Sequence, residues 1–190
     1  MTTRAESAAG TRRALIDAAT ALLEEGGPAA VTLRSVGERA GVSRGAPYGH
    51  FDGKAHLLAT LAAESWGRMR DRLAALPATE KDPAMRLRTA IQAIVELGVE
   101  HRPSYDLMFT VPNEHPELVT RAASEAQDLF IGLVADVVGP GVDPRRVAAL
   151  VMATTHGIAD MAANGHLRKE KWGVGTRELV DDLVAQVVRA

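Results

Sequence analysis

Apolar residues recur along this chain at the spacing of one helix face, and glycine or proline separates each such segment from the next. In the first segment Leu15, Ala19 and Leu23 lie one turn apart, and a Gly-Gly-Pro run follows at 26–28. A period of 3.6 residues is typical of amphipathic helices, whereas strands alternate at every second residue. Asp143-Pro144 supplies an N-cap followed by proline in the first turn, a helix-start signal. The pattern predicts an all-α protein.

The same reading divides the chain into about nine helices. A content of 46% apolar but only 4% aromatic residues fits this, because Ala, Leu, Val and Met must then build the core. We expect a first helix that ends at residue 25 and a last helix that begins at residue 176. The helices between them are expected over residues 32–40, 44–50, 52–76, 82–102, 104–110, 116–138 and 143–164. We expect an N-terminal domain over 1–55 and a C-terminal domain over 56–190.

Charge and composition exclude several function classes. A net charge of −2 excludes binding of nucleic acid through overall positive charge, so such a partner must be held locally. The absence of cysteine excludes disulfides, zinc–thiolate sites and cysteine nucleophiles. No apolar run approaches the ~20 residues that cross a bilayer, and residues 1–10 do not resemble a secretory signal. We therefore expect a cytoplasmic protein with no membrane partner.

Sequence motifs for enzymes and metal sites are absent. The chain has no glycine-rich phosphate or dinucleotide loop, no Gly-x-Ser-x-Gly and no His-Glu-x-x-His. No enzyme activity and no cofactor are expected, although an active site of scattered residues in the C-terminal part stays open. The histidines show no i, i+4 pair, so no metal is expected. They are His50, His56, His101, His115, His156 and His166.

Residues 32–54 predict a helix-turn-helix. Thr32 is a candidate N-cap, Gly41 supplies the left-handed turn, and Ser43 is a candidate N-cap for the second helix. The second helix of such a pair fits the major groove of DNA. Gly45 and Ala46 would let its beginning approach base edges closely.

Several side chains of this segment suit DNA. Arg44 is the long donor that can reach a guanine edge, and Tyr48 and His50 suit phosphate or sugar. Lys54 lies in the first turn of the next helix, whose amides also favour a phosphate. The alternatives are a surface hairpin in an ordinary bundle, a dimeric helical protein that does not bind DNA, or a small-molecule-binding protein. Binding to DNA at low salt separates a regulator from these.

Residues 29–58, AAVTLRSVGERAGVSRGAPYGHFDGKAHLL, resemble the DNA-binding domain of the tetracycline-repressor (TetR) family. The resemblance rests on the Thr-Leu helix start, the Ala-Gly-Val-Ser turn, the Tyr-x-His-Phe segment and the following lysine. It implies a ligand-responsive repressor that binds a palindromic operator as a homodimer. It also implies base recognition by Arg44, Gly45, Ala46, Tyr48 and His50, and phosphate contacts by Thr32, Ser43, Tyr48 and Lys54. Gly49 departs from the larger residue frequent there.

The C-terminal part resembles one branch of this family. Residues 102–109, RPSYDLMF, and Thr155-His156-Gly157 correspond to a domain with a Trp-His-Gly signature, in which threonine replaces the tryptophan here. The resemblance implies a pocket for a small-molecule effector of unknown identity. Aromatic, methionine and polar side chains suit such a pocket, although each also serves as ordinary core. The candidates are His101, Tyr105, Met108, Phe109, Phe130, Met152 and His156.

The last two expected helices predict a homodimer. They carry more apolar side chains than one monomer core needs, and alanines with Gly157 would let helix axes come close. Two copies could then form a four-helix bundle, with Val184 on its outer stripe. The alternative is that these residues close the monomer core.

Overall fold

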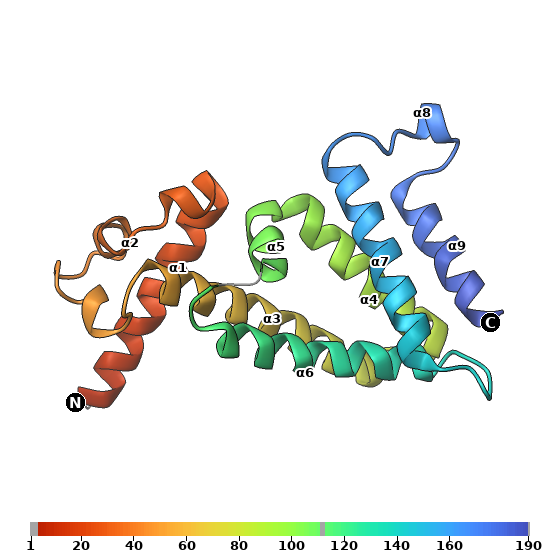
Figure 1. Cartoon of the computed structure of the whole chain (residues 1–190), viewed down its shortest axis with the longest axis horizontal. Helices are drawn as coiled ribbons and strands as arrows, with labels where there is room; N and C mark the ends of the chain where they lie inside the picture. Colours follow the sequence, from red (N-terminus) through yellow and green to blue (C-terminus); the bar gives the residue numbers. More distant parts are fainter. Residues whose placement is uncertain (1–3, 111–112, 190) are drawn as a thin grey trace. The chain divides into compact units, whose positions relative to one another are not determined.

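The protein is described from a computed structural model that covers residues 4–110 and 113–189 (Figure 1). This part of the chain is helical, with short connections and no strand, so the all-α prediction is confirmed. Its elements are α1 (Arg4–Ala30), α2 (Leu33–Arg39), the 3₁₀ turn η1 (Pro47–Gly49), α3 (Lys54–Thr79), α4 (Pro83–Glu100), α5 (Arg102–Phe109), α6 (Pro116–Ala135), α7 (Pro144–Ala163), α8 (Lys169–Trp172) and α9 (Thr176–Val188).

Most helix ends lie where the sequence predicts them. Regular helix in α1 ends before Gly26, because Gly27 has φ 65°, and one further turn runs to Ala30. Asp82 and Asp143 accept hydrogen bonds from the second amide of α4 and α7, as expected of N-caps. Pro77 does not end α3, which continues to Thr79. A proline in the last turn removes only its own amide bond, so the helix can continue past it.

The described chain forms two compact units. Unit 1 comprises residues 1–66 and 103–122, and unit 2 comprises residues 67–102 and 123–190. Helices α3 and α6 each contribute residues to both. The expected boundary between residues 55 and 56 separates the DNA-binding domain from the C-terminal domain, and it stays a prediction.

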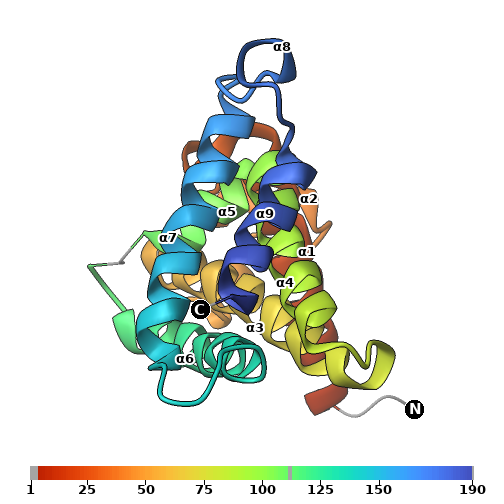
Figure 2. The same ribbon diagram turned by 90° about the vertical axis from the view of Figure 1, so that its right-hand side faces the viewer.

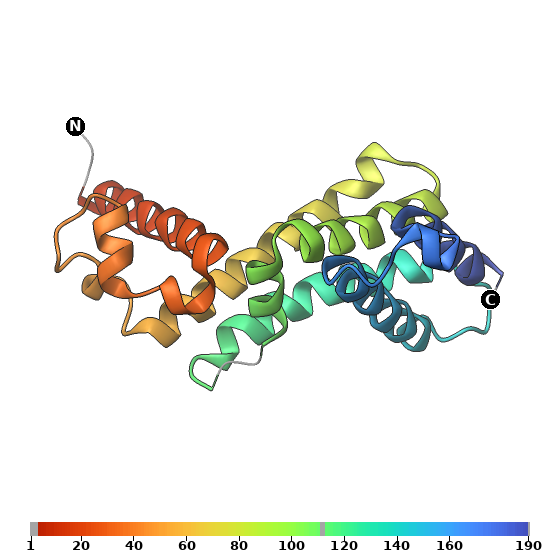
Figure 3. The same ribbon diagram turned by 90° about the horizontal axis from the view of Figure 1, so that it is seen from above.

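Unit 1 contains α1, α2 and η1 with the first half of α3. Figure 3 shows α1 and α2 side by side. Their apolar faces meet in one core in which Phe51, between η1 and α3, is 1% exposed. The other large members of this core are Leu15, Ile16, Leu23, Val31, Leu33, Val36, Leu57 and Leu61.

Unit 2 is built around α4, which packs against α7 and α9. Figure 2 shows α7 and α9 side by side in front of α4. The apolar face of α4 is almost fully enclosed, with Leu87 and Ile91 at 0% exposed. Val151 and Ile158 of α7 and Val180 and Val184 of α9 are also buried.

Candidate nucleic-acid interface

Helix α2 begins with the cap that the sequence predicts. The Oγ1 atom of Thr32 accepts a hydrogen bond from the Ser35 amide at 3.0 Å, and the Thr32 amide donates to Ser35 Oγ at 3.0 Å. This reciprocal pair is a capping box, which satisfies two amides that the first helical turn leaves free. Thr32 remains exposed, so its other side is open to a phosphate.

The turn after α2 has the predicted left-handed glycine. Gly41 has φ 67°, a conformation that costs little only for a residue without Cβ. The Val42 amide then donates to the Gly37 carbonyl at 3.2 Å, and the Val42 side chain packs against the core of unit 1. The expectation for Gly41 is confirmed.

The second helix is not the two-turn α-helix that we expected over 44–50. Residues 44–46 form a turn and residues 47–49 form η1. The amides of Ala46, Gly49 and His50 each donate to a carbonyl three residues earlier, which is the 3₁₀ pattern. Low helix propensity at Gly45, Pro47 and Gly49 accounts for this, because regular α-helix gains little here.

Ser43 does not cap this segment. The N-cap position of η1 is Ala46, and no side chain fills it. Ser43 instead takes part through its backbone carbonyl, which accepts from the Ala46 amide at 3.0 Å. Its hydroxyl is exposed and is therefore available to a phosphate.

The 3₁₀ turn η1 is fixed to α2 by a contact between Gly37 and Pro47, which was not predicted from the sequence. A Cβ atom added at Gly37 would lie 2.9 Å from Pro47 Cγ, closer than real Cβ contacts come. Pro47 and Gly37 are both buried. The glycine inside a short helix was the available signal, because glycine there is costly unless something packs closely against it.

Most of the predicted DNA-contacting residues are exposed, and five of these lie in segment 43–54. Ser43, Arg44, Gly45, Tyr48 and Lys54 are exposed, with Tyr48 at 64%. Tyrosine is enriched at interfaces, where its ring offers apolar contact and its hydroxyl a hydrogen bond. Ala46 and His50 are half-buried.

The basic side chains of this region fall into two groups. Arg34 pairs with Glu38 and Arg39 pairs with Glu25, so these two arginines are neutralised locally. These pairs raise the pKa of both arginines through hydrogen bonds to the carboxylates. Within the described residues, Arg44 and Lys54 have no carboxylate partner, and their charge is open to DNA.

The effector-site candidates fall into both units. In unit 1 the ring of Phe109 lies 4.9 Å from that of Tyr105 and 5.1 Å from that of Trp66. Trp66 Nε1 donates to the Met108 carbonyl at 3.0 Å. The structure thus brings three candidates together and adds Trp66, which the sequence reading missed because it lies on a distant helix.

The other candidates, His101, Phe130, Met152 and His156, belong to unit 2. Phe130 is 2% exposed, Met152 is half-buried, and His101 is exposed. Burial lowers the pKa of the half-buried His156 below its ordinary value of 6.5. The charge of Arg102 acts in the same direction, and that of Asp160 opposes it. A single pocket formed by all seven candidates stays a prediction.

The helices expected to dimerise carry both buried and exposed apolar residues. Val184 is 7% exposed and belongs to the core of unit 2, so its assignment to an outer stripe is wrong. Periodicity identifies an apolar face of α9, but it does not say that α4 and α7 cover it. Leu150 of α7 is 65% exposed and Val188 of α9 is 53% exposed. Ala149, Ala153 and Gly157 are exposed on the Leu150 side of α7.

Within the described ranges, no helix combines the length and the apolar character needed to cross a membrane.

Comparison with known proteins connects these features. A family model described as "Bacterial regulatory proteins, tetR family" matches residues 15–61. A second, described as "Tetracyclin repressor-like, C-terminal domain", matches residues 87–187. The HTH-type transcriptional repressor KstR of Rhodococcus jostii (strain RHA1) is 30% identical over 161 residues, which are 85% of this chain and 68% of that protein.

Two solved structures show the same fold. A protein with unknown function from Rhodococcus sp. RHA1 is 30% identical, with a TM-score of 0.81 over 94% of each chain. The SmeT–triclosan complex is 25% identical, with a TM-score of 0.63 over 93% of this chain and 90% of that one. The similarity therefore extends well beyond the segment around Gly41.

Proposed function

Because the chain belongs to the tetR family of bacterial regulatory proteins, and is a ligand-responsive DNA-binding repressor, we propose that residues 1–55 bind a palindromic operator and residues 56–190 bind the effector and form a homodimer. The observation that carries the proposal is the exposed segment 43–54, with two unneutralised cations beside a capped helix and a left-handed turn. The protein would act in the cytoplasm, where its operator lies.

Each side chain of this segment has a proposed role. Arg44 reads a base edge, because guanidinium donors match the two acceptors of guanine. Gly45 and Ala46 let the backbone approach the groove. Tyr48 and His50 contact DNA beside them, while Thr32, Ser43 and Lys54 bind phosphates. The exposure of Thr32, Ser43, Arg44, Tyr48 and Lys54 supports this assignment.

The test is selection of bound duplexes from a random DNA library by the purified full chain. We expect enrichment of a palindrome whose half-site centres lie about one DNA turn apart, roughly 34–36 Å. An Arg44→Ala/Lys54→Ala double variant should enrich no motif. The proposal is wrong if the wild type enriches nothing at low salt, or if the double variant enriches the same motif.

We infer that the effector is a small, largely apolar molecule that contacts the aromatic cluster of Trp66, Tyr105 and Phe109. Clustered aromatic side chains with a few polar groups suit such a ligand. Phe109 is 37% exposed, so the cluster has an open side. SmeT, which is 25% identical, was solved as a complex with triclosan, which supports a small-molecule effector.

We propose that the homodimer forms through α7 and α9. The exposed Leu150, flanked by the small residues Ala149, Ala153 and Gly157, gives α7 a face on which a second helix can come close. A two-fold axis through this face would bring α7 and α9 of both copies together. The oligomeric state of a Leu150 variant tests this.

A further inference from the structure

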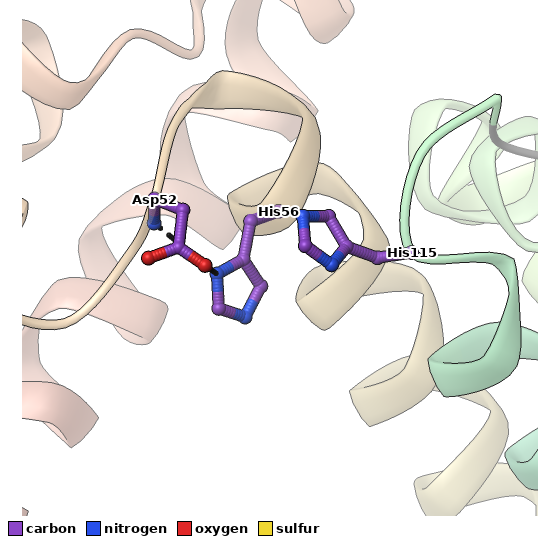
Figure 4. A group of neighbouring side chains, drawn as sticks. All are labelled: Asp52, His56 and His115. Carbon is purple, nitrogen blue, oxygen red and sulfur yellow. Dashed lines mark hydrogen bonds and ion pairs between the residues drawn. The ribbon is translucent and has the colours of Figure 1, made fainter.

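Unit 1 contains a cluster of two histidines and an aspartate that the DNA-binding function does not use. Asp52 lies two residues before α3, His56 lies in the first turn of α3, and His115 lies directly before α6. One potential ligand atom from each residue lies within 4.8 Å of those of the other two. Figure 4 shows His115 pointing toward the His56 ring from one side, with the Asp52 carboxylate on the other side.

We propose that Asp52, His56 and His115 form a binding site for a divalent metal ion such as Zn²⁺. Two imidazoles and one carboxylate are a common set of three protein ligands for Zn²⁺, with water in the fourth position. Mg²⁺ and Ca²⁺ prefer oxygen ligands, so this set selects against them. The site goes beyond the proposed function, since neither operator nor effector binding requires it.

The distances agree with this chemistry. Two ligands about 2.0–2.1 Å from a tetrahedral metal ion are separated by roughly 3.3 Å. His56 Nδ1 already lies 3.2 Å from Asp52 Oδ2. One ligand atom of His115 lies within 4.8 Å of those of the other two residues, and its ring is tilted by 30° to that of His56 with the centroids 4.6 Å apart. Asp52 has 82% of its side chain exposed, so small side-chain rotations can close the remaining gaps.

Both polar groups of Asp52 lie against one nitrogen of His56. The Asp52 amide donates to His56 Nδ1 at 3.2 Å, and Asp52 Oδ2 lies 3.2 Å from the same nitrogen. A metal ion bound by His56 Nδ1 and the Asp52 carboxylate would take the place of the amide hydrogen bond at that nitrogen.

Further groups around the cluster fit the same assignment. Glu117 Oε1 lies 3.7 Å from His115 Nδ1, so a second carboxylate is within reach of the fourth position. The His56 ring also meets the buried Phe51 edge-on at 5.8 Å, which restricts its orientation. A ligand held by packing binds metal at lower entropic cost. The histidine spacing in the sequence concealed the site, because His115 comes from another helix start.

The test is calorimetric titration of the metal-free full chain with ZnCl₂, with CoCl₂ as a spectroscopic probe of ligand geometry. We expect one Zn²⁺ per chain that excess MgCl₂ does not displace. His56→Phe keeps the ring against Phe51 but removes both nitrogens. His115→Gly removes the imidazole at a position with φ 55°, where glycine is unstrained. Each variant should weaken Zn²⁺ binding at least about tenfold, the lower end of the loss seen for outer-shell partners.

The matched control is His166→Asn, which removes an exposed histidine of unit 2 and should leave Zn²⁺ affinity unchanged. Zn²⁺ should also raise the melting temperature of the wild type and of His166→Asn but not that of His115→Gly, provided far-ultraviolet circular dichroism shows equal helix content. The proposal is overturned if the wild type binds no Zn²⁺, or if His166→Asn loses as much affinity as the two site variants.

Discussion

Arg44 and Lys54 are both exposed cations, yet their removal should have different effects on the affinity for operator and for random DNA. We expect Arg44→Ala to cost about 1–3 kcal/mol of binding free energy on the operator and much less on random DNA, because a base contact carries sequence information. Lys54→Ala should weaken binding to both and reduce the salt slope by about 1, because a phosphate contact releases counterions on any sequence. Fluorescence anisotropy at several salt concentrations measures both quantities.

Lys81→Ala is the matched control, because it removes an exposed lysine from the α3–α4 connection and should change neither quantity. Equal losses on operator and random DNA for Arg44→Ala would contradict its role as a base reader. A Lys54→Ala effect confined to the operator would contradict the phosphate assignment.

His156 predicts a pH dependence of stability. Its pKa is lowered by burial, with help from the Arg102 charge, so the unfolded state binds more protons just below pH 6.5. The free energy of unfolding should therefore fall as the pH drops from 6.5 through the lowered pKa. His156→Gln should lose less stability than the wild type between about pH 7 and pH 5.5, measured by urea unfolding. His166→Gln is the control, and a wild-type-like loss in His156→Gln would contradict the prediction.

Among the elements, the contact between α2 and η1 depends on one glycine. Gly37→Ala places a methyl group 2.9 Å from Pro47 Cγ, and neither the helix nor the proline ring can move freely. We expect the free energy of unfolding to fall by about 1–3 kcal/mol, as for other overpacked sites, and operator affinity to fall with it. Chemical denaturation and anisotropy measure the two effects.

Gly45→Ala provides the comparison within the same motif. No heavy atom lies within 4 Å of a Cβ added there, so stability should be unchanged. Operator affinity should still fall, because the added methyl group lies on the proposed DNA-facing surface. If Gly37→Ala unfolds like the wild type, the contact does not fix the motif.

The elements also show what sequence reasoning can and cannot reach. Thr32 and Gly41 were predicted because capping and left-handed turns depend on neighbouring residues. The 44–50 segment was predicted as α-helix because α and 3₁₀ turns share start signals and differ by one residue of hydrogen-bond spacing. Trp66 and His115 were missed because their partners lie on distant helices.

For the whole molecule, periodicity predicted which helix faces are apolar but not which neighbour covers them. Val184 was expected at a dimer interface and is instead buried in unit 2, whereas Leu150 remains exposed. We therefore expect Leu150→Glu to produce folded monomers that bind the operator weakly. Val184→Glu should instead lower the free energy of unfolding strongly, because it buries an unpaired charge. Sedimentation velocity combined with circular dichroism distinguishes the two, and a Leu150→Glu variant that stays dimeric would contradict the proposed interface.

In the proposed complex, segment 43–54 of each of two copies reads one half-site, and both half-sites lie on one face of the DNA. Insertion of about five base pairs, half a DNA turn, between the half-sites of the selected palindrome tests it most directly. We expect affinity to fall to that of a duplex with a single half-site, because the second segment then faces the wrong side of the helix. Unchanged affinity for the duplex with the insertion would contradict it.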